Sequence, residues 1–279
     1  MKELTSRVAL VTGASRGLGV RLVQTLARER MKLVLVARTA DKLEALAAEL
    51  KAAGAEALAL PADLSQTAEM EKVVERATAH FGAIDVLVNN AAVMKTSRYH
   101  ELRPDEIASE VGTDLVSPMI LTALVLPGML QRKRGHIVNM SSLAGKGGAP
   151  YHECYAASKA GLIAFTQSLR QEYRGTGVSA SVICPSYIQE AGMFQDMKDE
   201  SGVSSPALIG TTPEAVANAV VSAIRGDRAE VLVNRVPARP LMALLQLTPK
   251  GGERMMRLLG AFKPFDQVIE EKSPSKRPR

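Results

Sequence analysis

Tyr155 and Lys159, a tyrosine and a lysine four residues apart, are the pair in this sequence best suited to move a proton. Side chains at this spacing lie on one face of a helix, where they can touch. A free tyrosine has a pKa of about 10, so a tyrosine that works as a base near neutral pH needs its anion stabilised by roughly 4 kcal/mol. An ammonium group about 4 Å away supplies that much at an effective dielectric constant of about 20. Such pairs are common on helix surfaces, so this prediction needs the support of other motifs.

A glycine-rich loop follows the first apolar run of the chain and leads into an amphipathic segment. Backbone N–H groups of such a loop, together with the N-terminus of the helix behind it, bind a pyrophosphate, and glycines let the backbone approach it closely. The loop is a strong signal only between a strand and a helix, which is its setting here. The residues expected to contact a dinucleotide are Gly13, Ser15, Arg16, Gly17, Leu18 and Gly19.

The end of the second apolar run favours NADP(H) over NAD(H). A site for NAD carries a carboxylate there, which bonds the ribose hydroxyls, whereas this run ends in Val36, Ala37 and Arg38. Arg38 and Arg16 are suited to bind a 2′-phosphate, because charge-assisted hydrogen bonds are about twice as strong as neutral ones. The alternative is that both arginines are solvated surface charges.

Short runs rich in β-branched residues alternate with longer amphipathic segments. This pattern is typical of βαβ units and predicts an α/β fold with a doubly wound parallel sheet of Rossmann type. Helices are expected over 17–30 and 41–53, and Thr212 is expected to cap a helix that begins at Pro213. Ligands of this fold lie over the carboxyl ends of the strands. The expected strands cover 7–12, 32–37, 55–61, 86–88, 136–140, 178–184 and 230–234.

The chain is expected to consist of one dinucleotide-binding and catalytic domain, 1–236, and an extension, 237–279. The extension has apolar residues at helical spacing in 241–262, with Arg254 and Arg257 on the other side. With the segment 187–212 it is suited to form a lid over an apolar, lipid-like or ring substrate. Packing on the core or on a partner subunit is favoured, and contact with an anionic membrane is the weaker alternative. The last residues, 273–279, are expected to be disordered.

Together these motifs resemble the short single-domain branch of the short-chain dehydrogenase/reductase family. The loop matches TGxxxGxG, Asn-Asn-Ala-Ala at 89–92 is similar to NNAG with its last glycine replaced, and Tyr155 with Lys159 fits YxxxK. The resemblance covers about 6–236. It implies that Ser142 donates to the substrate oxygen, that Tyr155 passes the proton, and that Lys159 also holds the nicotinamide ribose. Further cofactor contacts that it implies involve Asp63, Leu64, Asn90, Pro185 and Ile188.

Two positions depart from the family's pattern. Asp114 stands where the family commonly has an asparagine that holds a relay water near the lysine. A carboxylate can still accept hydrogen bonds from that water or from Lys159, but its charge disfavours a tyrosinate unless the lysine neutralises it. Glu190 replaces the threonine that contacts the carboxamide, although the Ile188 backbone could still meet it. These departures leave open an alternative function, a dinucleotide-binding sensor or scaffold protein that has lost the chemistry.

Composition and charge restrict the remaining functions. The net charge is +6, but residues 250–279 hold eight basic and four acidic residues, so the rest of the chain is close to neutral. The basic tail lacks interleaved aromatic residues, which argues against nucleic-acid binding. Cys154, Cys184 and the four histidines show no ligand spacing, so we expect neither a metal nor a disulfide. Since no leader pattern and no apolar run of bilayer-spanning length is recognised, we expect a cytoplasmic protein. The resemblance implies a small carbonyl or alcohol substrate. From the family's habit we expect a homodimer or homotetramer.

Overall fold

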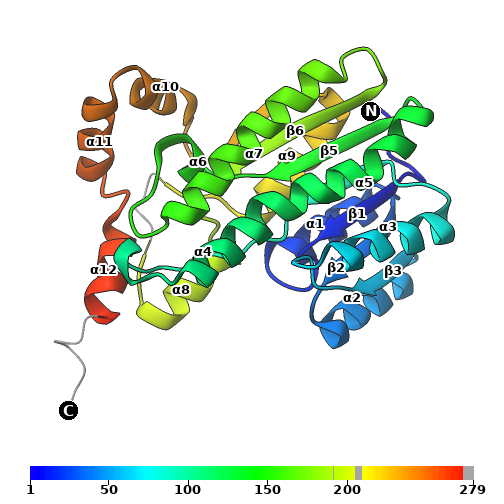
Figure 1. The fold of residues 1–279 in the computed structure, drawn as a ribbon, viewed down its shortest axis with the longest axis horizontal. Helices are drawn as coiled ribbons and strands as arrows, with labels where there is room; N and C mark the ends of the chain where they lie inside the picture. The colour runs from blue at the N-terminus through cyan, green and yellow to red at the C-terminus, as the bar shows by residue number, and fades with distance from the viewer. Residues whose placement is uncertain (191, 205–208, 273–279) are drawn as a thin grey trace.

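Seven parallel strands form one sheet in the order β3-β2-β1-β4-β5-β6-β7, which is the doubly wound arrangement expected from the sequence. The computed structural model describes residues 1–190, 192–204 and 209–272 (Figure 1). The strands are β1 (Val8–Thr12), β2 (Lys32–Ala37), β3 (Ala57–Pro61), β4 (Val86–Asn89), β5 (Gly135–Met140), β6 (Val178–Pro185) and β7 (Glu230–Val233).

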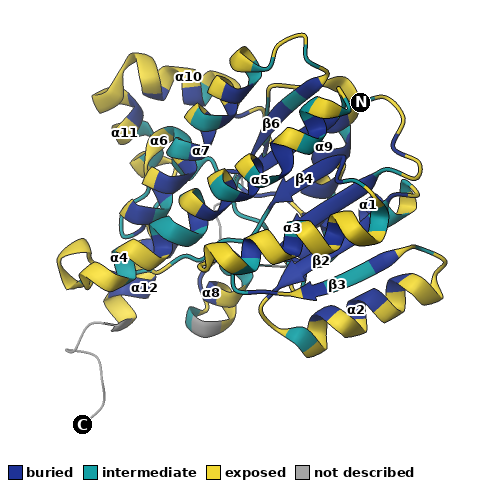
Figure 2. Cartoon of the chain, turned by 45° about the vertical axis from the view of Figure 1, so that its right-hand side comes forward, coloured by how far each residue is buried: buried dark blue, intermediate teal, exposed yellow. Residues whose placement is uncertain are grey.

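Two layers of helices cover the sheet. The helical elements are α1 (Leu18–Arg28), α2 (Ala40–Ala52), α3 (Thr67–Phe81), η1 (Tyr99–Glu101), α4 (Pro104–Val111), η2 (Gly112–Val116), α5 (Ser117–Gln131), α6 (Ala144–Gly147), α7 (Glu153–Glu172), α8 (Met193–Ser201), α9 (Pro213–Gly226), α10 (Arg239–Leu247), α11 (Pro249–Leu258) and α12 (Lys263–Lys272). Ala9 and Val11 of β1 pack in the core with α1, α2 and α9, whereas Val8 and Leu10 pack in the core with α3 and α5. Both faces of the strands are therefore buried, while the outer faces of α2 and α3 are exposed (Figure 2).

The predicted elements are confirmed with small changes at their ends. The second strand has its expected bounds, and the first two helices begin and end within two residues of the expected positions. The Thr212 side chain accepts a hydrogen bond from the N–H of Ala215 at 3.2 Å, which is the expected cap. One expectation is wrong, because the continuous helix Pro104–Gln131 is long and apolar enough to cross a bilayer. Its buried side packs on the sheet, as the core helix of a globular domain does.

In its described part, 237–272, the extension forms three helices at one end of the molecule. α10 and α11 meet at Thr248 in a sharp bend and contact each other, and this bent pair is called the α10–α11 hairpin below; α12 packs against α8 (Figure 1). The disorder expected for 273–279 concerns residues outside the described part of the chain. The expected separation of an apolar side from a basic side is only partly met. Met242 and Leu245 are buried, whereas Leu247 and Leu258 are exposed, as Lys250 and Arg254 are.

Candidate active site

Ser142, Tyr155 and Lys159 meet at the carboxyl end of the sheet. Ser142 follows β5, and the other two residues lie on the first turns of α7. The Ser142 hydroxyl lowers the pKa of the Tyr155 phenol, and Nζ of Lys159 lies 5.2 Å from the centroid of the tyrosine ring. The Ser141 hydroxyl donates to the carbonyl of Lys159 at 2.8 Å, which fixes α7 against the end of β5. The spacing in sequence thus becomes proximity in the fold.

Asp114 faces Lys159 from the π-helical segment η2. Its Oδ2 lies 3.3 Å from Nζ of Lys159, and both side chains are at most 3% exposed. Its other oxygen accepts a hydrogen bond from the N–H of Val93 at 2.8 Å. Burial raises the pKa of Asp114, and Lys159 opposes this rise. Burial also raises the pKa of Tyr155, where Lys159 lowers it and Asp114 raises it. The ammonium of Lys159 therefore interacts with both the phenol of Tyr155 and the carboxylate of Asp114.

A second buried carboxylate, which the sequence analysis missed, lies one helical turn before Asp114. Glu110 is 5% exposed, and its Oε1 has no hydrogen-bond partner in the described part of the chain. Burial, with the nearby charge of Asp114, raises the pKa of Glu110 to about 7. The spacing of four residues between the two carboxylates was the available signal, because it places them on one helix face.

The glycine loop packs closely against the ends of β1 and β4. Gly13 has a φ of +65°, and a Cβ there would lie 2.8 Å from Cα of Ala91. A Cβ on Gly19 would lie 2.0 Å from the carbonyl oxygen of Gly13. The Asn90 side chain donates to the carbonyl of Thr12 at 2.9 Å, which ties the loop to β4. Only residues without a side chain allow this backbone geometry, so the loop leaves open space in front of the N-terminus of α1.

The two arginines predicted to bind a 2′-phosphate have different surroundings. Arg38, at the end of β2, is exposed, lines the cavity and makes no ion pair with any residue that the structure describes. Arg16 also lines the cavity, but its Nη1 lies 2.7 Å from Oδ2 of Asp196 on α8. Lys42, one turn into α2, is exposed at the same cavity and was missed by the sequence analysis. The feature of the sequence that could have identified Lys42 is its spacing of four residues from Arg38.

One cavity of about 520 Å³ joins the glycine loop to Ser142, Tyr155 and Lys159. Asp114 and Glu190 do not line it; the former lies behind Lys159, and the latter has a φ of +69° in the loop after β6. Every other residue predicted for the site lines this cavity: Gly13, Ser15, Arg16, Gly17, Leu18, Gly19, Arg38, Asp63, Leu64, Asn90, Ser142, Tyr155, Lys159, Pro185 and Ile188.

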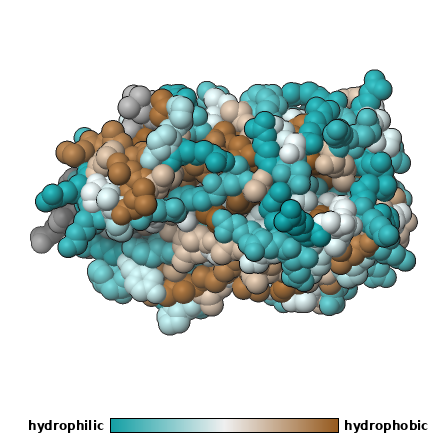
Figure 3. All heavy atoms as spheres, turned by 90° about the horizontal axis from the view of Figure 1, so that it is seen from above, coloured by the Kyte–Doolittle hydropathy of each residue, from teal (hydrophilic) through white to brown (hydrophobic). Residues whose placement is uncertain are grey.

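The far half of the cavity has apolar walls from distant parts of the sequence. Its walls include Met94 after β4, Phe194 on α8, and Met242, Leu245 and Phe265 of the extension. The extension is attached to the rest of the chain by a hydrogen bond, in which the Tyr187 hydroxyl donates to the carbonyl of Ala261 at 2.6 Å. Hydrophobic atoms gather at the end of the molecule that carries α10 and α11 (Figure 3).

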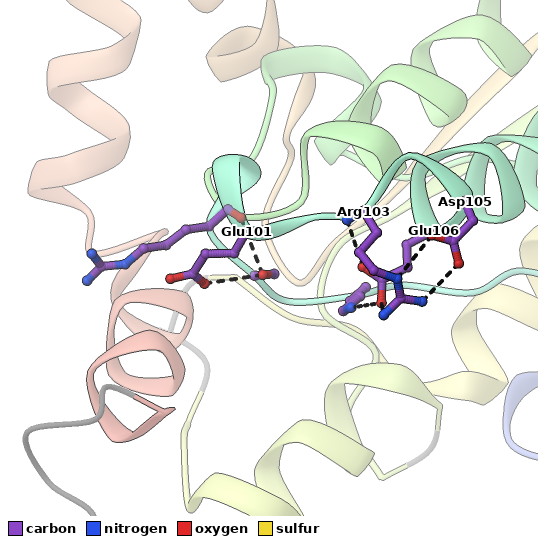
Figure 4. Close-up of polar contacts among 7 residues, drawn as sticks. Glu101, Arg103, Asp105 and Glu106 are labelled. Atoms are coloured by element: carbon purple, nitrogen blue, oxygen red, sulfur yellow. Dashed lines mark hydrogen bonds and ion pairs between the residues drawn. The ribbon is translucent and has the colours of Figure 1, made fainter.

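Ion pairs and hydrogen bonds join residues of the segment that follows Met94 (Figure 4). Arg103 binds Asp105 through two hydrogen bonds of 3.1 and 2.8 Å, and its backbone N–H donates to Glu106 at 2.9 Å. Glu106 also forms an ion pair with Lys95. These contacts are largely exposed, so we attribute to them the position of this segment and little stability.

Among the described residues, no group of three or more histidine, cysteine or acidic side chains is arranged to hold a metal ion. Cys154 and Cys184 are buried free thiols, and burial raises the pKa of both.

Comparison with known proteins agrees with this geometry. The family model of the short chain dehydrogenase matches residues 7–202. The ketoacyl reductase HetN of Nostoc sp. is 42% identical over 93% of this chain and 91% of its own. A metagenomic short-chain oxidoreductase solved in complex with NADP has a TM-score of 0.71 and 33% identity, covering 83% of this chain and 97% of that chain. A short-chain dehydrogenase/reductase of Burkholderia phymatum, solved with NAD, has a TM-score of 0.80 and 26% identity, covering 90% and 96%.

The chain therefore belongs to the short-chain dehydrogenase/reductase family. It is an oxidoreductase built on the family's Rossmann-type sheet.

Proposed function

We propose that this protein interconverts a ketone or aldehyde and the corresponding alcohol with NADP(H), and that Tyr155 exchanges the proton. The observation that carries the proposal is the single cavity, which has the glycine loop at one end and Ser142, Tyr155 and Lys159 at the other. When bound, NADP(H) supplies or accepts the hydride.

The residues around the cavity fit a dinucleotide with a 2′-phosphate. Gly13 and Gly19 keep side chains out of the space in front of α1, where N–H groups and the helix N-terminus favour an anion. Relatives of this fold were solved with either dinucleotide, so the choice depends on the end of β2. The exposed Arg38 and Lys42 supply two cations there and no carboxylate replaces them, which favours NADP(H). Arg16 would have to break its ion pair with Asp196 to bind the 2′-phosphate, so we assign Arg16 a smaller contribution to phosphate binding than Arg38.

Proton transfer follows from the contacts of Tyr155. In the reducing direction its phenol donates the proton to the substrate oxygen, while the Ser142 hydroxyl donates a hydrogen bond to the same atom. The resulting tyrosinate is stabilised by the ammonium of Lys159, 5.2 Å from the ring. Asp114 holds that ammonium in place and reduces its effect on the phenol.

The substrate that fits the far half of the cavity is apolar near its carbonyl. The side chains around this half include Met94, Phe194, Met242 and Leu245. None of these four side chains carries a charge that could pair with a charged ligand. A ketone on an acyl chain agrees with the cavity and with the name of the Nostoc relative, a ketoacyl reductase, and a ring ketone is the other candidate.

For assembly we propose a homodimer or homotetramer. Exposed apolar side chains at the junction of η2 and α5 support this, because Val116 and Met119 are 44% and 41% exposed. The two free buried cysteines agree with the reducing cytoplasm, which is the compartment we propose.

The test compares Tyr155→Phe with the unchanged enzyme. We expect calorimetric titration with NADPH to give nearly the same affinity for both, while turnover of a screened apolar ketone is lost in the variant. Full turnover by Tyr155→Phe would overturn the proton-transfer assignment. NADPH binding without Tyr155-dependent turnover of any carbonyl would instead favour the sensor or scaffold function.

A further inference from the structure

Exposed apolar side chains are concentrated on one part of the surface. In the described part of the chain, eight large hydrophobic side chains are exposed, and five of them lie between residues 236 and 259. Leu247 is 80% exposed and Leu258 is 87% exposed, which exceeds all the others. Both belong to the α10–α11 hairpin, at the outer end of the molecule (Figure 1). Two leucines this exposed on neighbouring helices indicate a surface that is covered by something else.

The other side of the same hairpin forms part of the cavity wall. Leu241, Met242, Leu245 and Met256 line the cavity, and Met242 and Leu245 are buried. The two helices pack closely, since a Cβ on Gly252 would lie 2.4 Å from the side chain of Leu245. The outward leucines are therefore held on a packed element beside the substrate region, and anything that binds them lies next to the cavity.

The charge around these leucines is strongly positive. Between residues 239 and 263 there is one acidic residue, Glu253, which pairs with Arg257 at 3.4 Å. Lys250 and Arg254 are exposed and form no ion pair with the residues that the structure describes. The basic residues of this range are Arg239, Lys250, Arg254, Arg257 and Lys263.

We propose that the outer face of the α10–α11 hairpin binds the surface of an anionic lipid bilayer. Leu247 and Leu258 enter the boundary between headgroups and acyl chains, and Lys250, Arg254 and Arg257 lie among the anionic headgroups. An apolar substrate then reaches the cavity from the bilayer past the hairpin. This last step depends on the proposed function, whereas the binding of lipid does not.

A second copy of the chain fits this face less well. In a two-fold symmetric contact the same patch faces itself, so the cations of one copy would lie against those of the other. An acidic protein is compatible with the charge, but the described surface offers two projecting leucines with cations around them, an arrangement suited to a soft planar surface. The choice between lipid and protein is decided by the following experiment.

The experiment measures co-sedimentation of the full-length protein with vesicles of phosphatidylcholine alone and of phosphatidylcholine with phosphatidylglycerol. We expect binding to the anionic vesicles that weakens with added salt, and much weaker binding to the neutral ones. Leu247→Asn with Leu258→Asn should reduce the partition coefficient at least tenfold, and each of Lys250→Gln and Arg254→Gln should reduce it by about fivefold. The matched control is Lys51→Gln with Lys72→Gln, two exposed lysines of α2 and α3, which should change it little.

Absence of binding to anionic vesicles overturns the proposal, and so does binding that the double leucine variant keeps in full. Light scattering without lipid supplies a further check. A change of oligomeric state in the double leucine variant would show that the face is a subunit interface and would also overturn the proposal. Thermal unfolding and NADPH titration of each variant establish that the fold and the cofactor site are unchanged. Failure of the proposed chemistry would leave the vesicle result unaffected, so the two failures are distinguishable.

Discussion

Replacing Asp114 by asparagine should move the pH dependence of the enzyme towards lower pH. The distances from Lys159 to Asp114, 3.3 Å, and to the Tyr155 ring, 5.2 Å, place the carboxylate oxygen at most about 8.5 Å from the ring. At an effective dielectric constant of about 20, an anion at that distance disfavours the tyrosinate by about 2 kcal/mol. Removing it therefore favours the tyrosinate, and we expect the midpoint of the pH profile to fall by about 1.4 pH units. The amide oxygen can still accept the hydrogen bond from Val93.

The assay is the oxidation of an apolar secondary alcohol with NADP⁺, followed as kcat/KM against pH. In the mechanism that we propose, oxidation requires a deprotonated Tyr155, so we expect the rate to rise with pH through the midpoint. Ultraviolet titration of tyrosinate, taken as the difference between each protein and its Tyr155→Phe counterpart, measures the same ionisation without substrate. A midpoint that stays in place or rises after Asp114→Asn would refute the reasoning, because it would mean that Asp114 carries no charge in the folded enzyme.

Three further predictions concern the cofactor site and stability. Arg38→Ala should weaken NADPH binding by ten- to a hundredfold in calorimetric titration and leave NADH binding nearly unchanged. An equal loss of affinity for both dinucleotides would contradict the assignment of Arg38 to the 2′-phosphate. Because burial raises the pKa of Glu110 to about 7, the folded state keeps a proton that the unfolded chain releases near pH 4.5, and stability falls as pH rises between these values. Urea unfolding at pH 5 and pH 8 should show a smaller fall for Glu110→Gln, by at most about 3 kcal/mol, and an unchanged fall would contradict the burial argument. Gly19→Ala places a Cβ 2.0 Å from the Gly13 carbonyl oxygen and should lower the Tm and abolish NADPH binding, whereas Gly112→Ala, with open space around its Cβ, should do neither.

Local patterns predicted the fold well because they depend on neighbours in sequence. The run 32–37 is buried on both faces and became β2 with the expected bounds, and Thr212 caps the helix that Pro213 begins. The proximity of Tyr155 and Lys159 also follows from helical spacing. These features needed only the period of the apolar residues and the types of the residues at helix ends.

Features that depend on contacts between distant segments could not be predicted in this way. The ion pair of Arg16 with Asp196 joins residues 180 positions apart, and it changes the part that Arg16 can play at the 2′-phosphate. The pKa of Glu110 depends on residues outside its own helix, because Lys95 and Lys159 both lower it against the effect of burial. Periodicity identified an apolar side in the extension, but it could not show that Leu247 and Leu258 point away from the core.

The division of the site between two parts of the chain explains why the chemistry is better defined than the substrate. The family model ends at residue 202, and the glycine loop, Arg38, Tyr155 and Lys159 all lie before that point. Much of the apolar wall comes from α10 to α12, which lie beyond it. The Nostoc relative aligns over 93% of this chain, so its alignment must include part of this extension. Since the hairpin has one side on the cavity and the other in solvent, changes in its sequence affect both the shape of the substrate region and the surface that we propose to bind lipid. Substrate choice and location in the cell are therefore expected to change together in this protein.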